Sequence, residues 1–265
     1  MTGALAAAAL AIAAVSGARG TWSPCGLSMI SAINPLSERA RGNRYFLTAG
    51  WFVFGSVLGG IALGSASGLL AFALRPLADQ RAAVLWIAAV ACLVALAADR
   101  RVAGFQLPLH PRQVNELWLT RYRRWLYAAG FGVQIGAGFA TYIMTAATYL
   151  AVVLAALTGS PALALVAGTV FGLVRGLAVL LSARCRTAQA LRQLHLRLSR
   201  LEPVSLRAAM AAEALTAGGL GFAAAGVVAG VGALLVASLL LVAGDPTLAA
   251  RAARTERPGH QMAMR

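Results

Sequence analysis

The residue with the clearest chemical potential is Cys25, which follows Pro24 in the stretch from Gly17 to Gly26. An arginine, three glycines, a proline and a cysteine stand there between two uncharged pieces, 2–18 and 21–37. Irregular backbone at membrane depth survives only where protein buries it or where it lines a cavity. If half-helix N-termini point at Cys25, their dipoles stabilise its thiolate, which suits disulfide exchange or soft-metal binding. The same residue types also fit a small, unreactive Cys25 that fills the break.

Both chemistries need a second sulfur. Cys92 lies midway along an apolar run and is the candidate resolving thiol, with a packed core residue as the alternative interpretation. Cys185 lies at the end of another run and is less well placed to reach Cys25. Three widely spaced cysteines form neither a CxxC motif nor a zinc-type cluster, so we expect no metal site and no cofactor.

A second group of polar residues suggests a different kind of site. Arg19 and Ser23 lie in the first break, and Gln134, Thr141 and Tyr142 lie in or near a second, glycine-rich interruption. If the two breaks meet near the membrane midplane, they line a cavity in which Arg19 binds an anionic group. This arrangement is typical of a transporter.

Two further charges fall inside apolar runs. Arg175 is nine residues from Arg184, and Glu213 is six residues from Arg207, which places them roughly 13 Å and 9 Å inside the membrane. An unpaired charge at that depth is costly, so we expect a structural ion pair between Arg175 and Glu213. The alternatives are an Arg175 that extends alone to the headgroups and a Glu213 that carries protons or binds a cation.

The composition requires a membrane protein, because 60% of the residues are hydrophobic and only 12% are charged. The net charge of +15 comes from 23 arginines without any lysine, against 8 acids. These arginines are scattered between apolar runs and form no single basic surface, so we expect a lipid bilayer as the environment and no nucleic-acid partner.

The apolar runs predict an all-α, polytopic protein with one integral membrane domain over 1–265 and a disordered polar tail at 245–265. Runs one and four are the discontinuous ones. The six expected spans are 4–36, 45–74, 82–98, 125–158, 161–183 and 208–244.

Arginine counts predict the orientation. The first, third and fifth loops carry fifteen arginines, whereas the second and fourth carry two. Since arginine-rich loops stay on the cytoplasmic side, we expect a multi-pass protein of the bacterial plasma membrane with both termini outside. Four arginines in the C-terminal tail count against this orientation.

Two loops carry patterns of their own. In 184–207, Leu191, Leu194, Leu198 and Leu201 share one helical face, which predicts an amphipathic helix on the inner leaflet; a helical extension of span five packed on a partner is the alternative. The segment 107–118 mixes prolines, aromatics and polar residues, which fits either an ordered cap or a plain interfacial segment.

Glycine recurs at every fourth position in several runs, as in Gly55 and Gly59, Gly60 and Gly64, Gly132 and Gly136, or Gly168 and Gly172. Such stripes allow close helix packing. We expect them to pack the spans within one chain, and a homodimer interface is the alternative.

The broken Ser23–Pro24–Cys25 span, Pro35 near its inner end, the Phe52–Gly59 run and the Ala164–Leu180 run resemble the cytochrome c biogenesis transmembrane proteins of the CcdA/DsbD type over about residues 4–183. The resemblance implies six helices in two inverted three-helix repeats, about 4–98 and 125–244, with helices one and four discontinuous. The chain is divergent, because the second Pro-Cys motif is absent.

The resemblance implies a carrier of reducing equivalents that acts through Cys25 with thioredoxin-like partners, and thus, if an enzyme, a membrane thiol-disulfide oxidoreductase. A small-solute or metal-ion transporter on the same scaffold is the first alternative. The second is an accessory subunit whose glycine faces hold another membrane protein.

Overall fold

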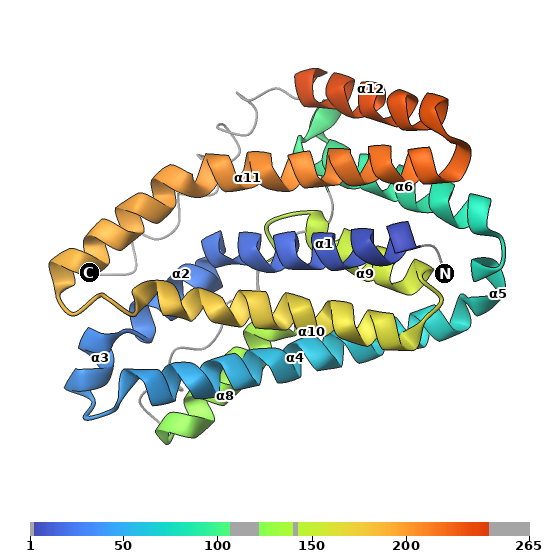
Figure 1. The fold of residues 1–265 in the computed structure, drawn as a ribbon. Coiled ribbons are helices and arrows are strands. Elements are labelled where there is room, and N and C mark those ends of the chain that lie inside the picture. Colours follow the sequence, from blue (N-terminus) through green and yellow to red (C-terminus); the bar gives the residue numbers. More distant parts are fainter. Residues whose placement is uncertain (1–2, 107–121, 140–142, 244–265) are drawn as a thin grey trace.

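The computed structural model describes residues 3–106, 122–139 and 143–243, and every regular element among them is helical (Figure 1). The all-α prediction is therefore confirmed. The helices are α1 (Gly3–Arg19), α2 (Pro24–Ala32), α3 (Pro35–Ala40), α4 (Tyr45–Ala73), α5 (Arg75–Ala78), α6 (Arg81–Asp99), α8 (Arg124–Gly136), α9 (Ala147–Leu157), α10 (Pro161–Leu177), α11 (Ala188–Ala225) and α12 (Val227–Ala243). Short 3-10 turns add η1 (Gly20–Trp22), η2 (Val102–Gly104) and η3 (Ala178–Ser182).

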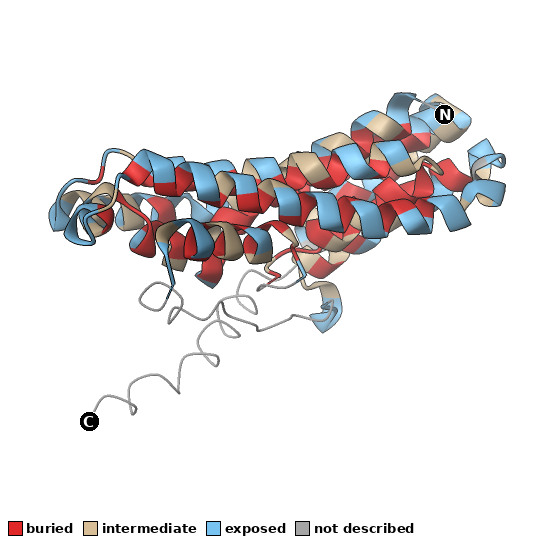
Figure 2. Ribbon diagram, turned by 90° about the horizontal axis from the view of Figure 1, so that it is seen from below, coloured by how far each residue is buried: buried red, intermediate tan, exposed pale blue. Residues whose placement is uncertain are grey.

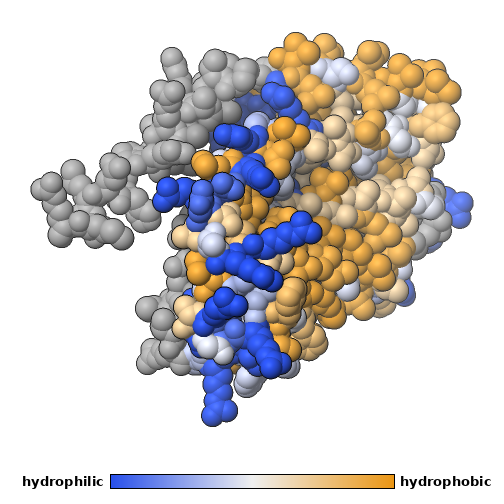
Figure 3. Space-filling model, turned by 60° about the vertical axis from the view of Figure 1, so that its left-hand side comes forward, coloured by the Kyte–Doolittle hydropathy of each residue, from blue (hydrophilic) through white to orange (hydrophobic). Residues whose placement is uncertain are grey.

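The long helices fit a lipid bilayer. Five described segments are long and apolar enough to cross a membrane, namely Gly3–Trp22, Tyr45–Ala73, Arg81–Asp99, Pro161–Ser182 and Ala188–Ala225. Buried and exposed residues alternate along the long helices (Figure 2). Many large apolar side chains are among the exposed ones, as a lipid environment requires. Most of the strongly hydrophilic side chains in Figure 3 gather on one part of the surface, a few more lie at the opposite edge, and a broad apolar area lies between them.

The first and fourth expected spans are interrupted, as predicted. In the first, α1 gives way to η1 and then to α2. In the fourth, α8 ends at Gly136 and α9 begins at Ala147, and Gly138 between them takes a positive φ of 71°. Each half of the fourth span is too short to cross a bilayer alone, since about 20 residues are needed.

The prediction of a single sixth span at 208–244 is wrong. The chain turns at Gly226, which has a φ of 78°, and α12 folds back along α11 (Figure 1). Apolar residues continue on both sides of this glycine, so hydropathy alone shows no boundary there. The far end of α12 is fastened to α6, because the Arg100 guanidinium donates a hydrogen bond to the backbone carbonyl of Leu241.

The separate amphipathic helix predicted at 184–207 is also wrong. This segment is the first half of α11, a continuous helix of 38 residues that begins at its Thr187 cap and contains Pro203. Three of the four leucines of the predicted face pack on the protein itself: Leu198 is buried, and Leu191 and Leu194 pack against the same core cluster. The fourth, Leu201, is exposed. The cap or interfacial segment predicted at 107–118 and the tail at 245–265 lie outside the described residues.

The glycine stripes pack the helices of one chain, as predicted. A Cβ on Gly55 would lie 2.1 Å from the backbone oxygen of Ala129 in α8, and one on Gly60 would lie 2.4 Å from that of Gly168 in α10. Only hydrogen allows such approach, so α4 presses its backbone directly against both neighbours. These glycine faces are occupied by the chain's own helices and do not offer a homodimer surface.

Candidate functional site

The break between α1 and α2 is an ordered turn held by Ser23. The Ser23 hydroxyl donates to the carbonyl of Gly20 at 2.7 Å and accepts from the amide of Gly26 at 3.1 Å. Pro24 then occupies the first turn of α2, where its missing N–H costs nothing. Gly26 is required sterically, because a Cβ there would lie 2.5 Å from the carbonyl oxygen of Thr21.

Arg175 from α10 enters this break. It is 3% exposed, and its guanidinium carbon lies 5.6 Å from the centre of the Phe171 ring. A Cβ on Gly20 would lie 2.9 Å from that guanidinium, so the glycine makes room for the arginine. Cys25, which is also buried, lies close enough to Arg175 for an electrostatic interaction between the two side chains. The predicted site residue Cys25 therefore has a cationic neighbour that sequence reasoning assigned elsewhere.

Arg19 fastens the end of α1 to α11. It is 4% exposed, donates to the Ser205 hydroxyl at 3.2 Å, and lies 3.9 Å from the half-exposed carboxylate of Glu202. Trp22 makes a second link, because its indole N–H donates to the carbonyl of Leu198 at 2.7 Å. The predicted cavity residue Arg19 thus binds the chain's own long helix.

The three cysteines are all buried and are not joined by a disulfide. Cys25 belongs to one hydrophobic cluster and Cys92 to another, with Cys92 on α6 beside Glu213. Cys185 follows η3, near Tyr45 of the cluster that contains Cys25. In the described part of the chain, no three His, Cys, Asp or Glu side chains come together in a way that could hold a metal ion.

The second break is braced by Asp99, at the end of α6. Its carboxylate accepts a hydrogen bond from the Thr145 hydroxyl and another, of 2.6 Å, from the backbone amide of Ala146. Both donors lie just before the start of α9. Asp99 therefore satisfies backbone at a helix start, where an acid is electrostatically favourable. The two broken segments touch, because the hydroxyls of Ser16 in α1 and Thr148 in α9 lie 3.0 Å apart and both are buried.

The other residues predicted to line a midplane cavity are only partly described. Gln134 is half-buried in α8, two residues before that helix ends. Thr141 and Tyr142 lie outside the described residues. Ser23 is fully buried and committed to capping α2, as its two hydrogen bonds show.

The ion pair predicted between Arg175 and Glu213 is not formed. Glu213 is fully buried, and neither of its carboxylate oxygens has a hydrogen-bond partner in the described residues. Its electrostatic neighbours are Asp99 and Cys92. The physical reason is that α1 packs against both α10 and α11, so Arg175 meets the break in α1 (Figure 1).

Sequence reasoning missed a polar cluster around Glu38 in α3. Its fully buried carboxylate accepts from the Tyr127 hydroxyl at 2.8 Å, from the Thr48 hydroxyl at 2.6 Å and from Arg41 at 2.8 Å. Tyr127 and Thr48 belong to α8 and α4, so one carboxylate joins three helices. The sequence offered one signal, because Glu38 is the single acid in an arginine-rich loop. It directly follows Ser37, whose backbone amide donates a hydrogen bond to the side chain of Asn34.

Comparison with known proteins gives three relatives of the same name. The chain is 31% identical to "Methylamine utilization protein MauF" of Paracoccus versutus over 169 residues, covering 60% of this chain and 58% of that protein. It is 31% identical to the protein of that name from Paracoccus denitrificans over 196 residues, covering 66% and 64%, and 27% identical to that of Methylophilus methylotrophus over 172 residues, covering 63% and 59%. The chain thus spans about three fifths of these curated relatives. No family model and no solved structure matches it.

These relatives correct the functional predictions. The resemblance to cytochrome c biogenesis proteins of the CcdA/DsbD type is wrong, since the curated relatives are methylamine utilization proteins. The prediction of a thiol-disulfide carrier acting through Cys25 loses its basis with that resemblance, as do the expected thioredoxin-like partners. None of the three relatives points to the alternative, a small-solute or metal-ion transporter.

Proposed function

We propose that this chain is a multi-pass protein of the bacterial plasma membrane with an accessory role in methylamine utilization. The observation that carries the proposal is its 31% identity over 196 residues to the methylamine utilization protein of Paracoccus denitrificans. Five described segments long and apolar enough to cross a bilayer support the membrane location. A framework of interlocked helices, with glycine backbones in direct contact, suits a structural or assembly role.

Growth on methylamine tests this role. A strain that lacks the gene is expected to grow normally on succinate with ammonium and to fail with methylamine as its nitrogen and carbon source, and a plasmid copy is expected to restore growth. Normal growth of the deletion strain on methylamine would contradict the proposal. Failure on both media would indicate a general membrane function instead.

We further propose that the first break is the part of the molecule on which this role depends, with Arg19, Ser23, Pro24, Cys25 and Arg175 as its residues. Two buried arginines beside an interrupted helix are costly to maintain in a membrane, which supports a functional reason for them. Cys25 acts here as the neighbour of Arg175, and Cys92 lies outside the site.

Paired variants in the same growth assay test the site. Arg175→Met and Cys25→Ser are expected to slow growth on methylamine, whereas Cys92→Ala, at an equally buried cysteine in another cluster, is expected to leave it unchanged. Membrane protein levels must be equal in all three strains. Equal growth of all three strains would show that the accessory role does not depend on the first break. It would not contradict the accessory role itself.

We propose two inverted repeats, formed by α1 to α6 and by α8 to α11, with α12 as an addition. Each half opens with a broken segment, α1 and α2 in one and α8 and α9 in the other, which supports the pairing. The domain is then a single membrane unit. With the N-terminus outside, as the arginine counts predict, a proposed total of seven crossings brings the end of α12 to the cytoplasmic side.

The changed C-terminal orientation rests on α12. Its last turn is bonded to Arg100, which lies in the arginine-rich third loop, and the four arginines beyond it then obey the same rule as the loops. Fusion of alkaline phosphatase and of green fluorescent protein after Ala243 tests this. Fluorescence without phosphatase activity is expected, and the reverse result would restore an outer C-terminus.

A further inference from the structure

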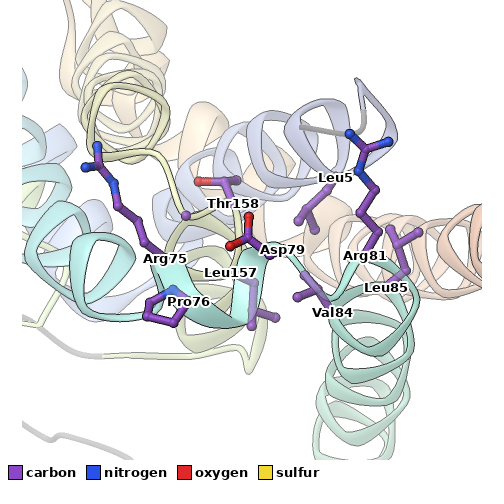
Figure 4. Close-up of a pocket in the computed structure, with 10 residues that line it drawn as sticks. Leu5, Arg75, Pro76, Asp79, Arg81, Val84, Leu85, Leu157 and Thr158 are labelled. Atoms are coloured by element: carbon purple, nitrogen blue, oxygen red, sulfur yellow. The ribbon is translucent and has the colours of Figure 1, made fainter.

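A cavity of about 770 Å³ opens at the end of the molecule where α1 begins, α4 and α5 end, and α9 meets α10 (Figure 4). One part of its lining is aliphatic, with Leu5 from α1, Val84 and Leu85 from α6, and Leu157 from α9. These four side chains are buried in the surrounding helices, so the wall they form is held in place. The volume falls within the range of pockets that enclose a small organic ligand.

The rim of the cavity is polar. Asp79 and Thr158 face its centre, and Arg75 and Arg81 stand on opposite sides of it (Figure 4). The Arg75 guanidinium also lies 5.0 Å from the centre of the Phe72 ring. No carboxylate among the described residues lies within ion-pair distance of Arg75 or Arg81, so Asp79 does not neutralise either of them directly. The rim carries a net charge of +1.

The position of these two arginines is unusual for the chain. The arginine-rich loops lie at the opposite ends of the spans, and positively charged residues are disfavoured on the outer side. Arg75 begins α5, in the short connection between α4 and α6, and Arg81 is the first residue of α6. Both line the same cavity, so one bound molecule can contact both.

We propose that this cavity binds a phospholipid with an anionic headgroup, whose phosphate and headgroup lie between Arg75 and Arg81 and whose acyl chain follows the aliphatic wall. Guanidinium groups bind phosphate through paired N–H donors. The aliphatic wall favours an alkyl chain over water, which a free anion would leave in place. The cavity lies where the spans end, at the level at which lipid headgroups meet hydrocarbon.

Binding of short-chain lipids to the purified full chain in dodecyl maltoside tests the proposal. The probe is dioctanoyl phosphatidylglycerol, and the comparison ligands are dioctanoyl phosphatidylcholine and glycerol phosphate, with the bound fraction measured by native mass spectrometry. Phosphatidylglycerol is expected to bind at least about tenfold more tightly than either comparison ligand. Equal binding of glycerol phosphate would show that the cavity takes soluble anions and does not need an acyl chain. Equal binding of phosphatidylcholine would show that the cavity does not select an anionic headgroup. Each result would overturn the proposal.

Variants locate the binding. The double variant Arg75→Ala/Arg81→Ala is expected to lose about tenfold in affinity for phosphatidylglycerol, whereas Arg184→Ala/Arg186→Ala removes the same charge from exposed arginines elsewhere and is expected to change affinity less than about twofold. Asp79→Asn removes the acid from the rim and is expected to tighten binding. Equal losses in the two double variants would show attraction to net charge only, and an unchanged affinity in Asp79→Asn would show that the charge of the rim does not act on the ligand; either result would refute the site.

Discussion

Replacing Gly55 with alanine tests one of the closest contacts between α4 and α8. A Cβ at this position would lie 2.1 Å from the backbone oxygen of Ala129, whereas ordinary van der Waals contact begins at 3.4 Å. The obstacle is backbone, which cannot rotate away as a side chain can. The helices α4 and α8 must therefore separate, and the separation also loosens the neighbouring Gly59 contact.

The expected difference in the free energy of unfolding between Gly55→Ala and a control variant has two contributions of opposite sign. Overpacking costs about 1–3 kcal/mol, and a backbone obstacle places Gly55→Ala at the upper end of that range. Gly50→Ala is the matched control in the same helix, because nothing lies within 4 Å of the added Cβ. There alanine is favoured over glycine by about 0.5–1 kcal/mol. The two variants should therefore differ by about 2–4 kcal/mol, with opposite signs relative to the unsubstituted chain.

Reversible unfolding in mixed micelles, followed by circular dichroism, measures this difference. The free energy of unfolding is expected to fall for Gly55→Ala and to rise slightly for Gly50→Ala. If both substitutions change it equally, α4 does not pack on α8 through this glycine. A loss for both would mean that α4 tolerates no added methyl at all, which would refute the distinction drawn from the local contacts.

Three further outcomes are expected. Tyr127→Phe removes a hydrogen bond to the buried Glu38 carboxylate and should lower the free energy of unfolding by about 1.5–3 kcal/mol in the same assay; an unchanged value would mean that water or another donor replaces the hydroxyl. Glu213→Met replaces a buried acid that has no hydrogen-bond partner in the described residues with an apolar side chain of similar size, so the melting temperature should stay equal or rise, and a fall of several degrees would reveal a partner for the acid. Burial raises the pKa of the Cys185 thiol, so in a variant with this single cysteine, alkylation by N-ethylmaleimide should be slower at pH 7.5 than in denatured protein and should accelerate as the pH rises; equal rates in both states at pH 7.5 would contradict the buried position.

Features encoded in local residue chemistry could be predicted from the sequence. The interruption around Ser23 and Pro24 was predicted because an arginine, three glycines and a proline concentrate there between two uncharged pieces. The packing of Gly55 and Gly60 was predicted because spaced glycines have few other uses in apolar helices. In both cases the signal and the structure occupy the same short segment.

Features that depend on which helices are neighbours could not be predicted in this way. The distance of Arg175 from the end of its apolar helix follows from counting residues, but the direction of its side chain around the helix axis depends on where α1 lies. The turn at Gly226 joins two apolar helices, so no change in hydropathy marks it. The cluster at Glu38 joins residues far apart in the chain, and no pairwise spacing reveals it.

α11 is one continuous helix that extends beyond the thickness of a bilayer. Its 38 residues extend over about 57 Å, well beyond the roughly 30 Å of the hydrocarbon layer, and Figure 1 shows the helix changing direction along its length. Trp22 donates a hydrogen bond to the carbonyl of Leu198, and Arg19 donates one to the hydroxyl of Ser205. These two contacts lie on either side of Pro203, whose missing N–H weakens the helix. The arginine-bearing first half of α11 is therefore held against the break in α1 on both sides of Pro203, so a substitution at Trp22 or Arg19 removes one of the two contacts that support the bend in α11.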